Sequence, residues 1–218
     1  MSNNNIPIIT IDGPSASGKG TVASIVAKKL GFHYLDSGAL YRLVALAAFR
    51  ANVALDNENE LAELAAKLDV VFDGGEIWLN QEKVTDEVRS EKCGNGASMV
   101  AVLPKVRAAL LARQRDFCQA PGLVADGRDM GSVVFPGART KIFLTASAEV
   151  RAERRFKQLK EKGVCAIIKN ILQDIQERDE RDSARSVAPL QKCADASLLD
   201  TTKLTIDEAV DVILKRFE

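Results

Sequence analysis

The sequence is short of the residues that build metal sites and disulfide frameworks. Among its 218 residues it has one histidine, His33, and four cysteines that stand far apart with no C-x-x-C spacing. A structural zinc site needs several His or Cys ligands at characteristic close spacings, so we expect no zinc site. Such separated cysteines are typical of reduced thiols in a cytosolic protein.

Long apolar runs and an excess charge of either sign are also missing. No stretch approaches the roughly 18 apolar residues of a membrane helix. The N-terminus MSNNNIPI has neither the basic nor the apolar region of a signal peptide. Thirty basic residues balance 30 acidic ones, and aromatic residues make up only 5% of the chain. We therefore expect no membrane partner and no nucleic-acid partner, because binding nucleic acid draws on basic and stacking side chains.

Strand and helix patterns alternate along much of the chain, whose length allows one domain with insertions or two small domains. Short apolar strands are expected at 6–11, 32–35, 123–125, 141–144 and 198–200, and helices at 21–30, 39–52, 58–68, 95–118, 148–162, 167–183 and 206–217. The β-α-β-α order at the start predicts a parallel, doubly wound sheet. Residues 69–85 interrupt this order with two or three short strands around a Gly74-Gly75 turn, which predicts an antiparallel insertion.

Between the first strand and the first helix lies the segment GPSASGKGT, residues 13–21, which matches the phosphate-binding pattern G-x-x-x-x-G-K. Small residues let the backbone N–H groups approach a polyphosphate closely, and the helix that follows presents its positive end. Lys19 adds a mobile positive charge. The alternative is a Gly/Ser-rich turn with a chance lysine, but the position between strand and helix favours phosphate binding.

Three further polar clusters follow expected strand ends or lie on a helix. They are Asp36-Ser-Gly with Tyr41-Arg42, Asp126-Gly-Arg-Asp129, and the segment 177–185. Taken singly, Arg42 could be a surface residue, Arg178 and Asp182 a surface ion pair at i and i+4, and Asp129 a helix cap. Together, several arginines near a nucleotide loop predict a second bound anion. Phosphoryl transfer requires that arrangement, because two anionic substrates must be held in line.

The motifs resemble those of the bacterial cytidylate kinases, which are nucleoside monophosphate kinases. The resemblance is carried by GPSASGKGT (13–21), LDSGALYR (35–42), ADGRDMGSVVFP (125–136), ERDERD (177–182), Arg185 and APL (188–190), in the order and spacing of the family. As in many such kinases, Gly20 stands where other phosphate loops have a Ser or Thr ligand for Mg²⁺. Ala16 stands where the family often has Gly, and its methyl group is compatible with the loop if the backbone there is not left-handed.

The resemblance implies a role for individual residues. Ser37, Arg42 and Arg128 would bind the phosphate of the acceptor, Ser98, Arg107 and Asp129 would read the cytosine, and Arg178 and Asp182 would hold the sugar. Lys19, Arg128 and Arg185 would be catalytic, and Asp126 would hold Mg²⁺ through water. The phosphates of ATP would be bound by Gly13, Ser15, Ala16, Ser17, Gly18, Lys19, Gly20, Thr21, Arg154 and Arg155.

We therefore expect an α/β fold with a P-loop NTPase core, a five-stranded parallel sheet with helices on both faces, a small antiparallel β insertion and a helical lid. Residues 1–38 and 122–218 would form the core, with the lid at about 149–163. Residues 39–121 would form the monophosphate-binding region, with the insertion at about 68–95. The implied activity is transfer of the γ-phosphoryl group of ATP to CMP or dCMP with Mg²⁺, in a cytoplasmic monomer whose partners are nucleotides.

Three alternatives compete with this interpretation. One is a kinase with the same core and another acceptor. Another is a nucleotide switch or ATPase, which is disfavoured because the chain has no N-K-x-D motif and Asp126 is followed by Gly rather than Glu. The third, a nucleic-acid-binding module, is disfavoured by the balanced charge.

Overall fold

The computed structural model describes residues 6–73, 75–161 and 163–217. The chain divides into two compact units, of which unit 1 comprises the described residues of Met1–Leu35 and Phe117–Glu218, and unit 2 those of Asp36–Asp116. Each unit is described by itself. The expected turn at Gly74, position 162 of the expected lid and residues 1–5 lie outside the described residues.

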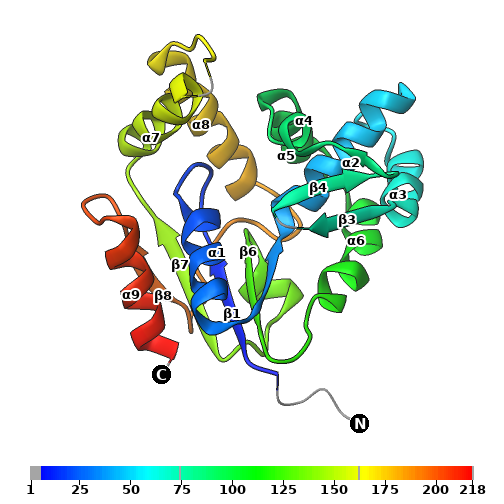
Figure 1. The fold of residues 1–218 in the computed structure, drawn as a ribbon. Helices are drawn as coiled ribbons and strands as arrows, with labels where there is room; N and C mark the ends of the chain where they lie inside the picture. The colour runs from blue at the N-terminus through cyan, green and yellow to red at the C-terminus, as the bar shows by residue number, and fades with distance from the viewer. Residues whose placement is uncertain (1–5, 74, 162, 218) are drawn as a thin grey trace. The chain divides into compact units, whose positions relative to one another are not determined.

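Unit 1 is built on a five-stranded sheet with the strand order β2-β6-β1-β7-β8. Its strands are β1 (Ile8–Asp12), β2 (His33–Asp36), β6 (Leu123–Gly127), β7 (Thr140–Thr145) and β8 (Ser197–Asp200). Strand β1 pairs in parallel with both β6 and β7, and β7 pairs in parallel with β8. This arrangement confirms the predicted α/β fold with a five-stranded parallel sheet (Figure 1).

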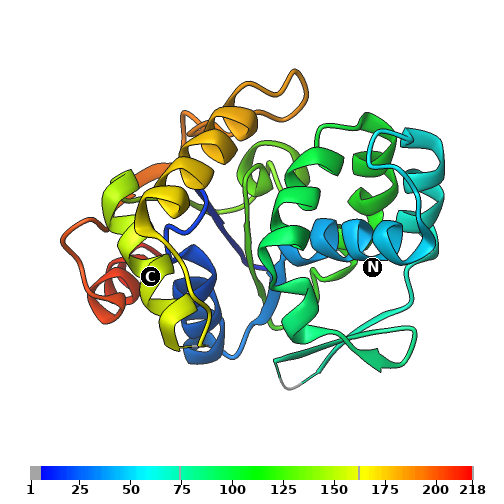
Figure 2. The ribbon, with the colours of Figure 1, turned by 90° about the horizontal axis from the view of Figure 1, so that it is seen from above.

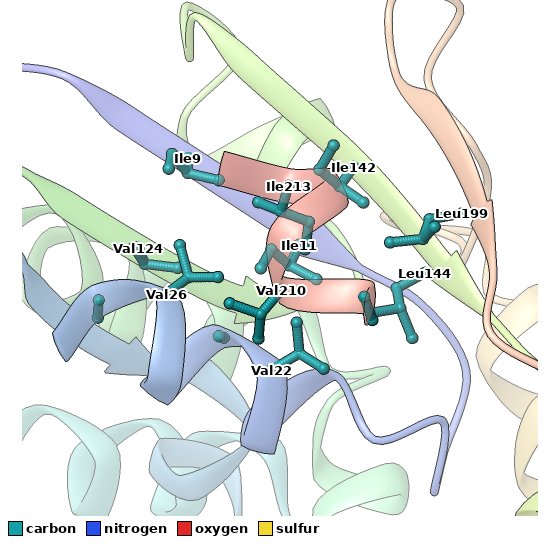
Figure 3. Packing of buried hydrophobic residues seen from close by; sticks show 13 residues of the cluster. Ile9, Ile11, Val22, Val26, Val124, Ile142, Leu144, Leu199, Val210 and Ile213 are labelled. Carbon is teal, nitrogen blue, oxygen red and sulfur yellow. The ribbon is translucent and has the colours of Figure 1, made fainter. Parts of the chain in front are cut away.

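The two faces of β1 have different chemistry because side chains alternate along a strand. Ile9 and Ile11 are fully buried and pack with apolar residues of α1 (Lys19–Leu30) and α9 (Ile206–Phe217). Figure 3 shows these side chains meeting between the strands and the two helices. Thr10 and Asp12 project from the opposite face, where they are also buried. This second face carries polar groups into the interior of unit 1.

A short π-helical turn and two longer helices complete unit 1. The π-helical turn η1 (Met130–Val134) follows β6 and was not predicted, whereas α7 (Ala148–Glu161) and α8 (Ile168–Ser183) lie close to the expected bounds. Helices α7 and α8 lie side by side (Figure 2) and share a small apolar cluster of Ala152, Ile171 and Ile175. None of the described helices is long and apolar enough to cross a bilayer.

Unit 2 combines five helices with the antiparallel insertion in its described residues. The helices are α2 (Ser37–Ala51), α3 (Glu58–Lys67), α4 (Thr85–Val88), α5 (Glu91–Val100) and α6 (Pro104–Asp116). The strands β3 (Val70–Asp73), β4 (Glu76–Leu79) and β5 (Glu82–Lys83) form a separate antiparallel sheet, as predicted.

Local signals explain several helix ends in unit 2. Pro104 is the first residue of α6, where its missing N–H breaks no helical hydrogen bond. Asp36 caps α2 by accepting a hydrogen bond from the Ala39 N–H. Strand β5 ends at Lys83, before Thr85 begins α4. The Oγ1 of Thr85 accepts a hydrogen bond from the N–H of Ile77.

Candidate functional site

The loop between β1 and α1 is shaped by two glycines. A Cβ at Gly13 would lie 1.9 Å from the carbonyl oxygen of Leu144, so only glycine allows the loop to pass this close to β7. Gly18 has a φ of 88° and precedes α1. Lys19 is the first residue of α1, is 9% exposed, and donates from Nζ to the carbonyl oxygen of Pro14 at 3.3 Å. The lysine therefore lies folded over its own loop.

The backbone at Ala16 is left-handed, with a φ of 56°. A methyl group fits this position without strain only where the backbone is not left-handed, so Ala16 is strained here. A left-handed conformation costs a residue with a Cβ about 1–2 kcal/mol, because the Cβ crowds the carbonyl oxygen. Ala16 also packs against the apolar cluster of α7 and α8, and this contact offsets part of the cost.

Gly20 leaves space beside a buried carboxylate. A Cβ at Gly20 would lie 3.6 Å from Oδ2 of Asp126 and 3.5 Å from the hydroxyl of Tyr34. Asp126 is 4% exposed, and its Oδ1 accepts from the Tyr34 hydroxyl at 2.8 Å. Mg²⁺ in phosphate sites keeps several waters and takes only one or two carboxylates, so this side chain fits a water-mediated role. No group of three or more His, Cys, Asp or Glu side chains that could hold a metal ion occurs among the described residues.

Arg128 connects the phosphate loop to α8. Its Nε donates to Asp182 Oδ2 at 2.7 Å, and its Nη2 donates to Ser15 Oγ at 2.9 Å. Arg185 donates to the other oxygen of Asp182. Asp182 is 1% exposed, so the alternative of a surface ion pair with Arg178 is wrong.

The charges of this group depend on one another. Burial alone would raise the pKa of Asp182, but the guanidinium groups of Arg128, Arg185 and Arg178 outweigh it and hold the pKa below its usual value. Burial alone would lower the pKa of Arg128, and the carboxylate of Asp182 reverses that shift and raises it. The carboxylate thus remains ionised and compensates the positive charge of the arginines in the interior of unit 1.

Helices α7 and α8 also hold the loop through contacts that the sequence analysis missed. Arg151 donates from Nη1 to the carbonyl oxygen of Ser15 at 3.0 Å and to Asp179 Oδ2 at 2.5 Å. Asp179 in turn accepts from the backbone N–H of Ser15 at 3.2 Å. A signal was available for Arg151, because it stands three residues before Arg154 and thus on the same face of a helix.

The two lid arginines assigned to ATP differ in their surroundings. Arg154 donates to the carbonyl oxygen of Ser17 at 3.1 Å and to the carbonyl oxygen of Thr201 at 2.7 Å. Arg155 donates to Gln158 of its own helix at 3.3 Å. Thr21, assigned to the same phosphates, is exposed on α1. The structure therefore brings Arg154 against the phosphate loop, whereas the contact shown for Arg155 stays within α7.

Four of the assigned residues, Ser37, Arg42, Ser98 and Arg107, belong to unit 2. Arg42 is half-buried and donates from Nη1 to the carbonyl oxygens of Val88 and Ser90 at 3.2 and 3.1 Å. Gly94 leaves room for the guanidinium group of Arg42, because a Cβ at position 94 would lie 3.0 Å from Nη1 of Arg42.

Ser37 and Arg107 have buried partners in the same unit. Ser37 donates from Oγ to Oε1 of Gln114 at 2.8 Å, a buried contact that sequence reasoning missed. Arg107 donates to the carbonyl oxygen of Ala101 at 3.2 Å and lies 5.8 Å from the ring centroid of Tyr41. Ser98 is 5% exposed on α5. Ser37 and Arg107 are thus held in place by partners in their own unit.

Asp129 and Asp12 lie at the start of η1. Asp129 is 3% exposed and precedes η1, but its side chain does not cap the turn. The capping acceptor is Asp12, whose two carboxylate oxygens each accept a backbone N–H of η1 at 2.8 Å, from Met130 and Gly131. Burial raises the pKa of Asp12 to about 6. The sequence analysis gave Asp12 no role.

Comparison with known proteins identifies the family of this chain. A sequence model of the family described as cytidylate kinase matches residues 9–218. A protein named cytidylate kinase from Chromobacterium violaceum is 63% identical over 213 residues, covering 98% of this chain and 96% of its own. Another of that name from Nitrosomonas europaea is 56% identical over 217 residues, covering 100% of this chain and 97% of its own.

One solved structure adds a likeness of fold alone. It is an uncharacterized protein from Eubacterium ventriosum, with a TM-score of 0.50 at 14% identity over 97% of this chain and 98% of its own. The family match and the two relatives both extend over nearly the whole chain. The chain therefore belongs to the cytidylate kinase family.

Proposed function

We propose that this enzyme transfers the γ-phosphoryl group of ATP to CMP or dCMP, giving ADP and CDP or dCDP, by direct in-line transfer with Mg²⁺. The observation that carries the proposal is the position of Arg128. Its guanidinium group is bonded to Ser15 of the phosphate loop and to Asp182 of α8, so one cation lies against both the donor loop and a residue assigned to the acceptor.

Electrostatic stabilisation would supply most of the catalysis. Negative charge spreads over the phosphoryl oxygens during transfer, and Lys19, Arg128 and Arg185 offer fixed positive charge for it. Asp182 keeps the two arginines oriented, which avoids the cost of arranging them during the reaction. Asp126 would hold Mg²⁺ through water, and the ion would neutralise charge on the phosphates of ATP.

No general base is needed, because a phosphate oxygen of the acceptor is already a competent nucleophile. Proximity and water exclusion matter instead, since water would otherwise accept the phosphoryl group. Helix α7 would act as the lid at about 149–163, and both Arg151 and Arg154 contact the loop. Gly13, residues 15–21 of the loop and Arg155 are also assigned to the phosphates of ATP.

Three groups of residues are assigned to the acceptor. Ser37, Arg42 and Arg128 would bind its phosphate, Ser98, Arg107 and Asp129 its base, and Arg178 and Asp182 its sugar. The cytosine amino group is a hydrogen-bond donor, so a carboxylate such as that of Asp129 is a suitable acceptor for it. Residues 39–121 would thus form the monophosphate-binding region. We place the activity in cytoplasmic pyrimidine nucleotide metabolism, which suits the four unpaired cysteines.

The test of this function is an ADP-release assay with ATP and Mg²⁺ against CMP, dCMP, UMP, AMP and shikimate. The expected result is turnover confined to CMP and dCMP. Turnover with another acceptor would discard Ser98, Arg107 and Asp129 as cytosine readers. A lack of any acceptor-dependent ADP release would overturn the kinase assignment itself.

Substitution of the phosphate-binding arginines tests the acceptor site. Arg42→Ala and Arg128→Ala should each lower kcat/KM for CMP by about 100-fold or more, because each loses a charged contact to the acceptor's phosphate, while the Kd for ATP changes little. Arg50→Ala is the matched control, because Arg50 lies on α2 like Arg42 but pairs with Glu82 and Glu87. Unchanged CMP kinetics in both variants would refute the assignment.

A further inference from the structure

The N-terminus of η1 is capped by a carboxylate from another element. The first N–H groups of a helical turn have no partner within the turn. Here the N–H groups of Met130 and Gly131 donate to Oδ1 and Oδ2 of Asp12, each at 2.8 Å. Asp12 is 5% exposed and ends β1, so this cap reaches η1 from 118 residues earlier in the chain.

Asp12 fixes both ends of the segment that contains Arg128 and Asp129. At one end its backbone is in register with Gly127 in the pairing of β1 with β6. At the other end its side chain binds the N–H groups of Met130 and Gly131. Only Arg128 and Asp129 lie between these two attachments. Asp12 also directly precedes Gly13, the first residue of the phosphate loop.

The surroundings of Asp12 show that an ionised carboxylate is held there at a cost. The pKa of Asp12 is raised to about 6, because burial and, to a smaller extent, the nearby carboxylate of Asp129 outweigh the two backbone N–H groups and Lys19, which lower it. Burial raises the pKa of the Cys193 thiol, and the charge of Asp12 raises it as well, whereas the charge of Lys141 lowers it. A neutral side chain would avoid the cost of burial, but it could not accept from both N–H groups with two equivalent oxygens.

Gly131 makes the close approach possible. A Cβ at this position would lie 3.0 Å from Thr10 Oγ1, 3.2 Å from the Cδ of Lys141 and 3.4 Å from Oδ2 of Asp12. A side chain here would be tighter than ordinary van der Waals contact, so either the side chains of Thr10 and Lys141 or η1 itself would have to shift. The cap therefore depends on a carboxylate from β1 and on a glycine in η1.

We infer that Asp12 is a positioning residue for the acceptor, which acts by holding Arg128 and Asp129 in the geometry that binds CMP. The inference rests on the proposed roles of Arg128 and Asp129 and adds the residue that fixes them. A cap with only a structural role would affect stability and would affect the use of ATP and CMP alike.

The first experiment compares kinetics of Asp12→Asn with the wild type. The variant should raise KM for CMP by about 10- to 100-fold, because a displacement of about 1 Å in positioning groups has effects of that size. The KM for ATP should change by no more than about threefold. Equal changes in both KM values, or no change for CMP, would overturn the inference.

Gly131→Ala disturbs the same cap from the side of η1 and serves as the second variant in case Asp12→Asn does not fold. It should give the same selective rise in KM for CMP. Thr10→Val is the control, because Thr10 is fully buried on the same face of β1 and its Oγ1 has no hydrogen-bond partner among the described residues. It should leave both KM values unchanged.

The cap can also be tested in the ligand-free enzyme by following amide proton shifts as a function of pH. Without CMP in the sample, the titration of its phosphate group cannot contribute to these shifts. In the ligand-free enzyme, the amide proton shifts of Met130 and Gly131 should titrate with a midpoint near pH 6 and should lose this titration in Asp12→Asn. Amide shifts of Met130 and Gly131 that are the same in Asp12→Asn as in the wild type at every pH would contradict the cap.

Asp129→Ala, measured in parallel, separates the inference from the proposed site. If Asp129→Ala erodes the preference for CMP over UMP but Asp12→Asn and Gly131→Ala leave the KM for CMP unchanged, the inference fails and the site stands. If Asp129→Ala leaves the preference intact, the proposed base contact fails.

Discussion

Charged side chains in the interior of unit 1 have opposite charges beside them. Asp182 lies between Arg128 and Arg185, and Arg151 is bonded to Asp179. Removing one partner of such a pair leaves a buried charge without compensation, which costs more than the pair itself contributes. Substitutions of these residues therefore affect stability as well as catalysis, and both must be measured.

Asp182→Asn should lower the free energy of unfolding at pH 7 by about 3 kcal/mol, because it leaves two buried guanidinium groups without their carboxylate. The pKa of Asp182 is lower in the folded enzyme than in the unfolded chain. Its stabilising contribution is therefore complete above the unfolded pKa of about 4 and is lost as the pH falls through the folded pKa. Urea unfolding of wild type and variant at several pH values should show a difference that shrinks below about pH 4.

Asp211→Asn is the control for that experiment. Asp211 lies 3.5 Å from Lys29 in an exposed ion pair, and such pairs contribute at most about 1 kcal/mol. A loss of stability in Asp182→Asn that is no larger than in this control would contradict the buried network.

Ala16→Gly should raise the free energy of unfolding by up to about 1 kcal/mol, because glycine adopts a left-handed backbone without the strain of a Cβ. The loss of one methyl contact and the greater freedom of glycine in the unfolded chain reduce the gain. Ala23→Gly in α1 is the control with the opposite expected sign, and it should lower the free energy of unfolding by about 1 kcal/mol. A lower stability of Ala16→Gly in urea unfolding would show that the packing of Ala16 outweighs its backbone strain.

At the scale of elements, α7 and α8 are held to each other mainly by a small apolar cluster and to the phosphate loop by polar contacts. The cluster contains Ala152, Ile171 and Ile175, far fewer buried residues than the main core of unit 1. Elements with little buried apolar area open locally at lower free energy than a core sheet. This construction suits a lid, because polar contacts can be exchanged for contacts to a ligand.

Asp179→Ala should loosen α8 without affecting the sheet, since it removes the acceptor for Arg151 and for the Ser15 N–H. Amide hydrogen exchange in α8 should become about tenfold faster, which corresponds to roughly 1.4 kcal/mol in local opening. Exchange in β1 and β7 should not change. Asp174→Ala, an exposed position on the same helix, should leave exchange as in the wild type. Equal acceleration in β1 would mean that Asp179 supports the whole unit.

At the scale of the whole molecule, the main core of unit 1 lies between the sheet and the pair α1 and α9 (Figure 3). Ile11→Ala should lower the free energy of unfolding by about 2–5 kcal/mol, because it removes a fully buried side chain from the central strand and leaves a cavity. Leu198→Ala on β8 is the control, since Leu198 is 56% exposed and its loss should cost about 0.5 kcal/mol or less. Urea unfolding followed by circular dichroism gives both values.

The sequence by itself determined the features that depend on neighbouring residues. The apolar run before Gly13, the small residues of the loop and the helical pattern from Thr21 predicted a strand, a phosphate-binding loop and a helix. Gly31, with a φ of 66°, ends α1, and Pro104 begins α6, because these residues restrict the backbone wherever they occur. Motif order and spacing were enough to indicate the family, and hence the sheet and the insertion.

Only the tertiary structure decided which distant groups meet. The cap of η1 by Asp12 spans 118 residues, and the contact of Asp179 with Ser15 spans 164. A carboxylate in a turn pattern or on a polar helix has many partners available, and packing selects one of them. The tertiary structure also decided the left-handed backbone at Ala16. The surrounding structure sustains the strain at this residue, and the local sequence gives no signal of it.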